Sequence, residues 1–346
     1  MLQSRTEFAR TTLKEIAQLV GVSTNTVSKV LNDSRSNTRV SEKTRAEILK
    51  VAVDLKYRPN EVARSLVRQS TRMLGFFAQF EFLNAANGFL AEVMGGLHEA
   101  AAARGYDLVL HHIPSGVGPD ALERSLTDRR VDGLIFFAPE GPQLIHRLVR
   151  ADLPVVAIAD ACEGVPSVVV ADEIGAKMLV HHLQSLGHRQ VIYRGWFKSP
   201  ESARIREQSF FDEAKRVGLK VHKGRVMDST HDGDLLPDEL KALSGGVTAI
   251  AAWADTSAEA TCDALVARGI RVPEDVEVTG FNGIPTPTRP RWELTTIVAP
   301  WRQVGLTAAE HLINLIQGES VPLLDVFPVH LRPGKTTMPW NPTKEP

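Results

Sequence analysis

The stretch TLKEIAQLVGVSTNTVSKVL, residues 12–31, decides the fold of the N-terminal part of the chain. It begins with a capping box, because Thr12 can accept a hydrogen bond from the amide of Glu15 while the Glu15 side chain reaches back to the helix start. The apolar residues that follow repeat at helical spacing, and Gly21 supplies the left-handed residue that ends many helices. The stretch therefore predicts a short amphipathic helix over residues 13–20.

Two further helices follow the first. Ser23 is the next N-cap candidate, and the apolar spacing predicts a second helix over residues 24–31. Ser41 opens a third helix, whose apolar stripe extends to Leu55. Three short helices with a tight turn between the first two make a helix-turn-helix bundle, so we expect an all-α domain of this kind over residues 11–58.

The second helix carries polar side chains suited to reading DNA at its exposed N-terminal end. Asn25 can bond an adenine edge bidentately, and Lys29 can donate to guanine O6 or N7. Thr24 can contact a thymine methyl group or a phosphate, and Ser28 adds another hydroxyl. The alternative is that these residues are merely solvated, since Thr, Asn and Lys are common on surfaces.

A second motif, YRPNEVARSL at residues 57–66, continues this segment. Asn60 can cap a helix so short that it needs a partner in order to fold. Arg64 would face phosphates, while Leu66 suits a wedge that enters the minor groove and bends the duplex. The alternative is a linker whose leucine packs on the neighbouring domain.

The charge of the chain is divided unevenly. Over all 346 residues, 40 Lys and Arg stand against 41 Asp and Glu. Residues 1–72 hold 14 basic and 7 acidic residues, a net charge of +7, which leaves −8 for the remainder. A basic end of this size indicates a nucleic-acid partner or another acidic surface.

The composition excludes several other classes of protein. The two cysteines, Cys162 and Cys262, are too few for a disulfide scaffold or a Cys-type zinc module, and they suit a reducing cytoplasm. The polar start of the chain does not resemble a signal peptide, and no apolar run reaches the roughly 18–20 residues that span a bilayer. We therefore expect a cytoplasmic protein with no membrane partner.

From residue 73 onward, short apolar strands alternate with helical stretches. Nearly continuous apolar strands joined by helices indicate parallel sheets covered on both faces, and this many strands exceed one small sheet. The fold class we expect is an N-terminal all-α helix-turn-helix domain joined to a two-lobed α/β core of doubly wound parallel sheets. The predicted strands are 74–77, 108–110, 134–137, 155–158, 168–170, 191–193, 249–252, 276–279 and 294–297, and a last sheet segment is expected near 329–331.

Ligands of doubly wound sheets bind at the carboxyl ends of the strands, in the crevice where the strand order reverses. Polar and aromatic residues that follow the predicted strands are therefore candidates for binding a small-molecule effector. They are Gln79, Phe80, Asp160, Ser202, Arg206, Trp253, Asp255 and Asn282.

The N-terminal motifs occur together in one known family. Residues 12–31, VSEKTR at 40–45 and the motif at 57–66 resemble the DNA-binding domain of the LacI/GalR family, which includes the lactose and purine repressors. The residues that we expect to contact DNA are Thr12, Ser23, Thr24, Asn25, Thr26, Ser28, Lys29, Asn32, Tyr57, Asn60, Ala63, Arg64 and Leu66.

The resemblance implies that Thr24, Asn25 and Lys29 read the major groove and that Leu66 inserts at a central CG step. Lys29 stands where the family more often has Arg or His, and the loop at 32–39 is longer than in the best-known members. The operator sequence therefore does not transfer.

The remainder of the chain resembles the effector-binding core of the same family, which is similar to periplasmic sugar-binding proteins. Landmarks are SARIR at 202–206 and RVPEDV at 271–276. The resemblance implies that Arg206 clamps the effector, and a guanidinium fork suits hydroxyls, carboxylates or phosphates. The alternative for Arg206 is a surface arginine on a helix.

Two departures bear on the effector. Sugar-binding members commonly carry Asn-Asp where this chain has Ala254-Asp255, and Asp where it has Asn282. Losing a carboxylate removes a strong acceptor for sugar hydroxyls. Asp255 alternatively caps the helix that follows it, and Trp253 and Phe80 alternatively line a core instead of stacking on a ligand.

The sequence carries none of the common enzyme signatures. It lacks G-x-x-x-x-G-K-[ST], G-x-G-x-x-G after the first strand, H-E-x-x-H and G-x-S-x-G. His111-His112 and His181-His182 are pairs of adjacent residues, which rarely share one metal. We predict no catalytic residue, no metal and no cofactor.

We therefore expect a cytoplasmic transcriptional repressor that binds a palindromic operator as a homodimer, under the control of an effector, a sugar or sugar derivative, bound between two lobes. Two alternatives stay open: a nucleobase or other non-sugar metabolite acting as co-repressor, and a ligand-binding protein without regulatory output. Residues 332–346 contain four prolines and no heptad pattern, so they cannot form a tetramerising helix, and we predict a dimer.

The expected domain limits follow from these assignments. The DNA-binding domain covers 11–58, the hinge helix and linker 59–71, and the effector-binding and dimerisation domain 72–340. Within the latter, one lobe takes about 72–170 and 301–328, and the other about 171–298 and 329–340.

Overall fold

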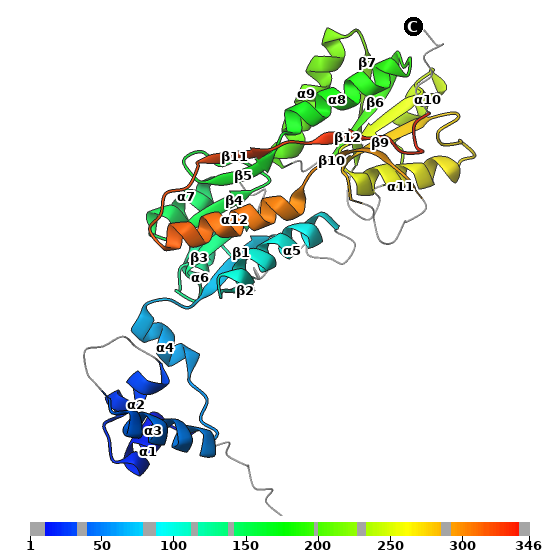
Figure 1. Cartoon of the computed structure of the whole chain (residues 1–346). Helices are drawn as coiled ribbons and strands as arrows, with labels where there is room; N and C mark the ends of the chain where they lie inside the picture. Colours follow the sequence, from blue (N-terminus) through cyan, green and yellow to red (C-terminus); the bar gives the residue numbers. More distant parts are fainter. Residues whose placement is uncertain are drawn as a thin grey trace, which may run out of the picture. The chain divides into compact units, whose positions relative to one another are not determined.

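The computed structural model describes residues 11–32, 40–78, 88–111, 117–137, 142–196, 200–226, 233–284 and 292–338. The chain divides into two compact units, Met1–Thr71 and Arg72–Pro346 (Figure 1). Two of the predicted effector residues, Gln79 and Phe80, lie outside the described residues.

Unit 1 contains the three predicted helices and the short fourth one. They are α1 (Leu13–Val20), α2 (Thr24–Leu31), α3 (Glu42–Asp54) and α4 (Glu61–Arg68). The capping box is confirmed, because Thr12 N donates to Glu15 Oε2 at 2.7 Å and Glu15 N donates to Thr12 Oγ1 at 3.3 Å. Gly21 ends α1 with a φ of 74°. The sequence thus sets the limits of α1 through its capping residues.

The core of unit 1 draws on all three of its first helices. Ile16, Val27 and Ile48, one from each helix, are fully buried and belong to one cluster. Ser23 and Ser41 start α2 and α3 by accepting backbone N–H bonds of 3.1 Å. The capping hydrogen bonds and the shared buried core therefore both support a helix-turn-helix arrangement.

Unit 2 contains two six-stranded sheets. The strands are β1 (Met73–Ala78), β2 (Asp107–His111), β3 (Gly133–Phe137), β4 (Val155–Ile158), β5 (Ser167–Val170), β6 (Gln190–Trp196), β7 (Lys220–Val226), β8 (Ala249–Ala252), β9 (Glu277–Asn282), β10 (Thr295–Val298), β11 (Leu324–Phe327) and β12 (His330–Arg332). The helices are α5 (Gly88–Ala103), α6 (Pro119–Leu126), α7 (Pro142–Arg150), α8 (Asp172–Ser185), α9 (Glu201–Arg216), α10 (Pro237–Ser244), α11 (Asp255–Val266) and α12 (Trp301–Ile316).

The first sheet has the order β11-β5-β4-β3-β1-β2 and the second the order β12-β10-β9-β8-β6-β7. Neighbouring strands run parallel, except that β12 is antiparallel to β10. We call the first sheet with α5, α6, α7 and α12 lobe 1, and the second sheet with α8–α11 lobe 2. The predicted two-lobed, doubly wound core is confirmed.

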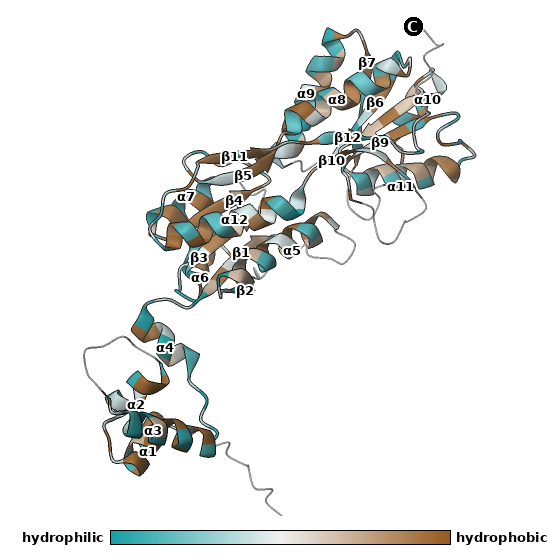
Figure 2. Cartoon of the chain, viewed as in Figure 1, coloured by the Kyte–Doolittle hydropathy of each residue, from teal (hydrophilic) through white to brown (hydrophobic). Residues whose placement is uncertain are grey.

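Burial explains why most strands are readable from the sequence. β3, β4 and β5 are buried along their whole length. The helices α8 and α12, in contrast, carry both polar and apolar residues (Figure 2). The structure adds β7 and β11, which the sequence analysis does not predict. Both are edge strands with exposed positions, so neither needs the continuous apolar run of a central strand.

The chain crosses between the lobes three times, from β5 to α8, from β10 to α12 and from β11 to β12. After the second crossing, α12 packs along α5. Glycines permit a close approach, since a Cβ on Gly96 would lie 1.9 Å from Arg302 O and one on Gly305 2.2 Å from Val93 O. These two helices therefore meet backbone to backbone.

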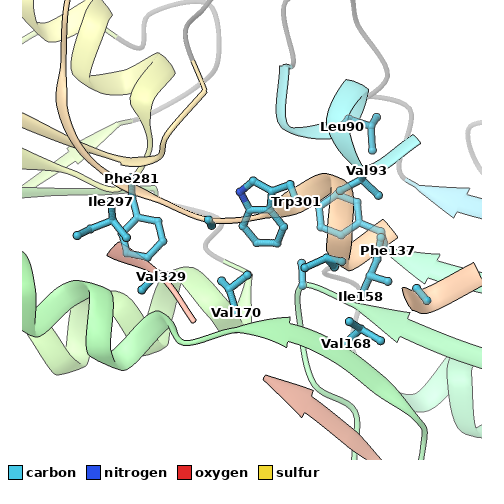
Figure 3. Packing of buried hydrophobic residues seen from close by; sticks show 14 of the residues in the cluster. Leu90, Val93, Phe137, Ile158, Val168, Val170, Phe281, Ile297, Trp301 and Val329 are labelled. Atoms are coloured by element: carbon cyan, nitrogen blue, oxygen red, sulfur yellow. The ribbon is translucent and has the colours of Figure 1, made fainter. Parts of the chain in front are cut away.

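The apolar core continues through the crossing segments (Figure 3). Trp301 lies between Phe281 and Ile297 on the side of lobe 2 and Val93 and Phe137 on the side of lobe 1. Its side chain is almost fully buried. The two lobes thus share one hydrophobic cluster.

Candidate functional site

The first turn of α2 presents polar side chains on the surface of unit 1. Thr24 and Asn25 are exposed. Ser23 caps the helix through Thr26 N, and the hydroxyls of Ser23 and Thr26 lie 2.9 Å apart in a hydrogen bond. Ser23 and Thr26 therefore fix the helix start, and Thr24 and Asn25 are the exposed side chains at the start of this helix.

The second turn of α2 carries the remaining polar residues of this face. Ser28, Lys29 and Asn32 are half-buried, and Asn32 Nδ2 donates to Ser28 Oγ at 3.1 Å. Two other predicted DNA contacts have structural partners, because Thr12 caps α1 and Tyr57 packs against the core of unit 1. Their contact with DNA stays a prediction.

Among the described residues of unit 1, α4 carries the most exposed large apolar side chains. Leu66 is 77% exposed and Val67 is 86% exposed. The helix begins after Asn60, whose carbonyl accepts from Arg64 N at 3.0 Å. The Arg64 side chain forms an ion pair with Glu61, so a phosphate would have to compete with that carboxylate for Arg64. Ala63 is exposed on the same helix.

In unit 2, the described effector candidates lie near the carboxyl ends of the strands, as the fold requires. Asp160 follows β4, Trp253 follows β8, Asn282 ends β9, Ser202 and Arg206 lie in α9, and Asp255 is the first residue of α11. All six therefore surround the same end of the two sheets.

A hydrogen bond joins the two lobes near the carboxyl ends of their strands. Asp160 of lobe 1 accepts from Ser202 N of lobe 2 at 2.7 Å. Burial raises the pKa of the Asp160 carboxyl, while the hydrogen bond from Ser202 and the charge of Arg206 oppose that rise. A carboxylate is favoured at the first turn of a helix, where the N–H groups have no partner within the helix. Since its two ends sit on different lobes, this bond depends on how the lobes are oriented.

Arg206 is buried within lobe 2. It is 5% exposed, and its Nε donates to Asp172 Oδ1 at 2.5 Å. Its Nη1 donates to Trp253 O at 3.2 Å, and its guanidinium carbon lies 3.8 Å from the centre of the Phe281 ring. Burial raises the pKa of Asp172, against the opposing charge of Arg206. The guanidinium therefore links α8, α9, β8 and β9, and it is not a surface arginine.

Asp255 does not cap its helix. Residue 254 occupies the N-cap of α11 and makes no side-chain cap. Asp255 is 3% exposed, and its two carboxylate oxygens accept from Thr296 Oγ1 at 2.5 Å and from Ile284 N at 2.7 Å. Burial raises its pKa to about 7, with these hydrogen bonds opposing the rise. Asp255 thereby holds the segment after β9 and strand β10, and the alternative that it caps α11 is wrong.

Trp253 forms an aromatic corner with Trp196, the last residue of β6. The ring centres lie 5.0 Å apart at an interplanar angle of 77°. Trp253 Nε1 is shielded from solvent and has no hydrogen-bond partner among the described residues, and the same holds for Asn282 Oδ1. The carboxyl ends of β8 and β9 therefore carry a donor and an acceptor that the described part of the chain leaves unsatisfied.

Sequence reasoning missed several members of this site. Asp172, Trp196, Phe281 and Thr296 all contact its predicted residues. Trp196 ends a strand, which is the signal used for the other candidates. Asp172 follows the first crossing between lobes, and its pairing with Arg206 depends on the packing of α8 against α9, which the sequence does not reveal.

The described residues were also considered as a possible metal site and as a possible membrane span. These residues contain no group of three or more His, Cys, Asp or Glu side chains able to hold a metal ion. His181 and His182 have different partners, Glu213 and Thr337. No helix in the described part of the chain is long and apolar enough to cross a membrane.

Known families match both units of the chain. Residues 12–60 match bacterial regulatory proteins of the lacI family, and residues 180–337 match a periplasmic binding protein-like domain. The HTH-type transcriptional repressor PurR of Photobacterium profundum is 30% identical over 317 residues, which cover 89% of this chain and 93% of the relative. PurR of Vibrio cholerae serotype O1 is 28% identical over 88% of this chain and 91% of its own length.

Solved structures agree with these matches. The lac repressor dimer bound to operator and the anti-inducer ONPF superposes with a TM-score of 0.80 at 27% identity, covering 95% of this chain and all of that chain. The transcriptional regulator CelR in complex with cellobiose gives a TM-score of 0.68 at 26% identity, covering 94% of this chain and all of that chain.

A helix-turn-helix unit joined to a two-lobed binding core defines a DNA-binding transcriptional regulator with an effector-binding domain, a class that is not enzymatic. The chain belongs to the LacI family of bacterial regulatory proteins.

Proposed function

We propose that the protein is a cytoplasmic repressor that binds a palindromic operator as a homodimer. The observation that carries this proposal is the capped helix α2, which exposes Thr24 and Asn25 at its N-terminal end on a folded helix-turn-helix unit. In such units these positions meet base edges in the major groove. Lys29 extends the same face by one turn.

The proposed effector site is the cleft between the lobes. Two contacts between candidate residues support this proposal, one between Asp160 and Ser202 and one between Arg206 and Trp253. A ligand that binds better when the lobes adopt one orientation shifts the population toward that orientation and changes operator affinity. We propose a sugar or sugar derivative as the first class to test, since CelR was solved with cellobiose.

In the proposed DNA complex, Leu66 acts as a minor-groove wedge. Its neighbour Val67 is similarly apolar and at least as exposed, which makes Val67→Ala a matched control. An operator is first selected from random duplexes with the full-length protein. Leu66→Ala is then expected to weaken binding to the selected duplex roughly tenfold or more, because the energy that stabilises the bent duplex is lost.

The same variants are measured on random DNA, where phosphate contacts dominate. Leu66→Ala should leave that binding nearly unchanged, and Val67→Ala should change neither. Equal losses on selected and random duplexes would exclude the wedge. Failure to select any sequence would contradict operator binding itself.

A further inference from the structure

A buried histidine connects a surface threonine to a buried carboxylate at the amino-terminal edge of the lobe 2 sheet. His188 lies between α8 and β6, Thr248 directly precedes β8, and Glu277 is the first residue of β9. The sheet register brings these positions together, because Val191 pairs with Ala249 and Ala249 pairs with Glu277. The three residues therefore lie at the opposite end of the strands from the effector candidates.

Short distances join the three side chains in a row. His188 Nδ1 lies 2.7 Å from Thr248 Oγ1 in a hydrogen bond. His188 Nε2 lies 3.0 Å from Glu277 Oε2, and neither of these two atoms has a hydrogen-bond partner elsewhere in the described part of the chain. An ionised carboxylate can only accept, so a neutral His188 keeps its proton on Nε2. Nδ1 is then the acceptor, and the Thr248 hydroxyl donates to it.

The three side chains differ in their exposure to solvent. The side chains of His188 and Glu277 are 7% and 8% exposed, whereas Thr248 is exposed. Space is open beside the turn that precedes Thr248, since a Cβ on Gly246 would meet no atom within 4 Å. A reagent in solution can therefore reach the hydroxyl, while the two groups behind it are shielded.

This arrangement makes Thr248 chemically distinct from an ordinary surface hydroxyl. A hydroxyl is a weak nucleophile until an adjacent base accepts its proton, and a third group that orients the base completes the arrangement. The carboxylate stabilises the imidazolium that forms when the histidine takes the proton. Ser244 offers a contrast, because it is also exposed but donates to Leu240 O at 3.1 Å, and a backbone carbonyl is not a base that can take the proton.

We propose that Thr248 is a site of covalent acylation by small activated acyl compounds, with acyl phosphates as the class of donor. Thr248 Oγ1 attacks the carbonyl carbon of the donor, and the hydroxyl proton passes to His188 Nδ1. The bond between that carbon and the phosphate oxygen breaks, so an ester forms on Thr248 and phosphate leaves. The proton then passes from His188 to solvent. The step occurs once per chain, so it is a modification of the protein without turnover.

The test incubates the full-length protein with acetyl phosphate and maps the products by mass spectrometry of its peptides. Acetyl phosphate also acylates lysines, but hydroxylamine cleaves esters and leaves those amides intact. We expect a hydroxylamine-sensitive acetyl group on Thr248 in the folded protein. In guanidinium chloride, which separates the hydroxyl from His188, the labelling of Thr248 should be slower by roughly 100-fold or more. The proposal is overturned if no ester forms at Thr248 or if folding makes no difference to its rate.

Substitutions assign the roles of the nucleophile and the base. Thr248→Val should abolish the ester and Thr248→Ser should retain it, while Ser244→Ala is the matched control and should change nothing. His188→Gln should slow labelling roughly 100-fold or more, because general-base catalysis contributes about that much. A thermal melt shows whether this variant is folded. Unchanged labelling in the folded variant would exclude His188 as the base, and if the variant does not fold, the comparison of the folded and unfolded original protein decides.

Glu277 acts through His188, so its test needs a measurement that packing alone would not move. Glu277→Gln keeps an acceptor beside Nε2 but removes the negative charge that favours the protonated ring. Labelling of Thr248 should slow roughly tenfold, and the rise of its rate with pH should move to lower pH. A rate profile that keeps its position on the pH axis would contradict an electrostatic role of Glu277.

Discussion

Arg206 and Asp172 form a buried ion pair, so replacing either residue alone should lower the stability of the protein. Both side chains are buried, and the Nε–Oδ1 distance is 2.5 Å. Replacing only the arginine leaves a buried carboxylate without its partner. We expect Arg206→Ala to lower the free energy of unfolding by about 3–5 kcal/mol.

Urea unfolding followed by circular dichroism measures this loss. The double variant Arg206→Ala, Asp172→Asn should recover part of it, because the amide carries no charge to desolvate. A single variant as stable as the original protein would show that the pair is not electrostatically coupled. The test also matters for function, since loss of effector response in Arg206→Ala must be separated from loss of stability.

Asp255 gives the stability of the protein a pH dependence. Its pKa rises from 3.8 to about 7 on burial, so the folded chain holds this proton more tightly than the unfolded chain. The stabilisation that the proton provides is complete below the unfolded pKa and is lost as the pH rises through the folded pKa. Asp255→Asn should therefore show a smaller fall in melting temperature than the original protein between about pH 5 and about pH 8.

Asp275→Asn is the control for this measurement. The Arg271 side chain and backbone hydrogen bonds lower the pKa of Asp275 to about 2, so Asp275 stays ionised throughout that interval. Its removal should leave the pH dependence of the melting temperature as it was. An Asp255→Asn profile parallel to that of the original protein would contradict the raised pKa.

The sequence predicts Arg206, Asp160 and Ser202, the partner of Asp160, but it does not predict Asp172, the carboxylate partner of Arg206. Strand ends are visible as the points where an apolar run stops, which is why Asp160, Trp253 and Asn282 were predicted together. Partners such as Asp172 come from helices that approach only after the lobes fold. The unpaired Trp253 Nε1 is likewise a property of three-dimensional packing among the described residues.

The α5–α12 contact makes a prediction at the level of secondary-structure elements. Alanine in a helix interior is normally favoured over glycine by about 0.5–1 kcal/mol. At Gly96, however, a Cβ would meet the backbone of α12, 1.9 Å from Arg302 O. Gly96→Ala should force the helices apart and cost about 1–3 kcal/mol.

Gly95→Ala provides a matched control on the same helix. A Cβ at Gly95 would meet only the far end of the flexible Arg302 side chain, at 2.7 Å from Nη1. We expect its stability in chemical denaturation to equal or exceed that of the original protein. Equal effects of the two substitutions would show that α5 and α12 can separate at little cost.

Elements were predicted best where local chemistry specifies them completely. The limits of α1 follow from Thr12, Glu15 and Gly21, all of which act as the sequence suggests. β7 and β11 were missed because an edge strand pairs on one side only and tolerates polar residues. Their place in the sheets is determined by the strands beside them.

At the scale of the whole molecule, the prediction concerns assembly. The lac repressor structure that superposes on this chain is a dimer on its operator. We expect a dimer in solution, as in that structure. Light scattering over a range of concentrations measures the mass, and a stable tetramer would contradict the prediction.

The net charge of the whole chain hides an uneven distribution of charge between its two units. A value of −1 for 346 residues suggests no affinity for nucleic acid. The division into +7 for residues 1–72 and −8 for the rest was readable from the sequence, and the structure places the boundary between its two units at nearly the same residue.

The three crossings between the lobes also constrain how the protein is made. During synthesis, unit 1 is complete once residue 71 has left the ribosome. Lobe 1 is synthesised next, but it cannot finish folding at that point. Two of its elements, α12 and β11, are synthesised only after almost all of lobe 2. Until they emerge, the face of α5 that carries Gly96 has no helix to cover it. An apolar surface exposed for that long favours misfolding and association, so we expect the nascent core to depend on chaperones more than the DNA-binding unit does.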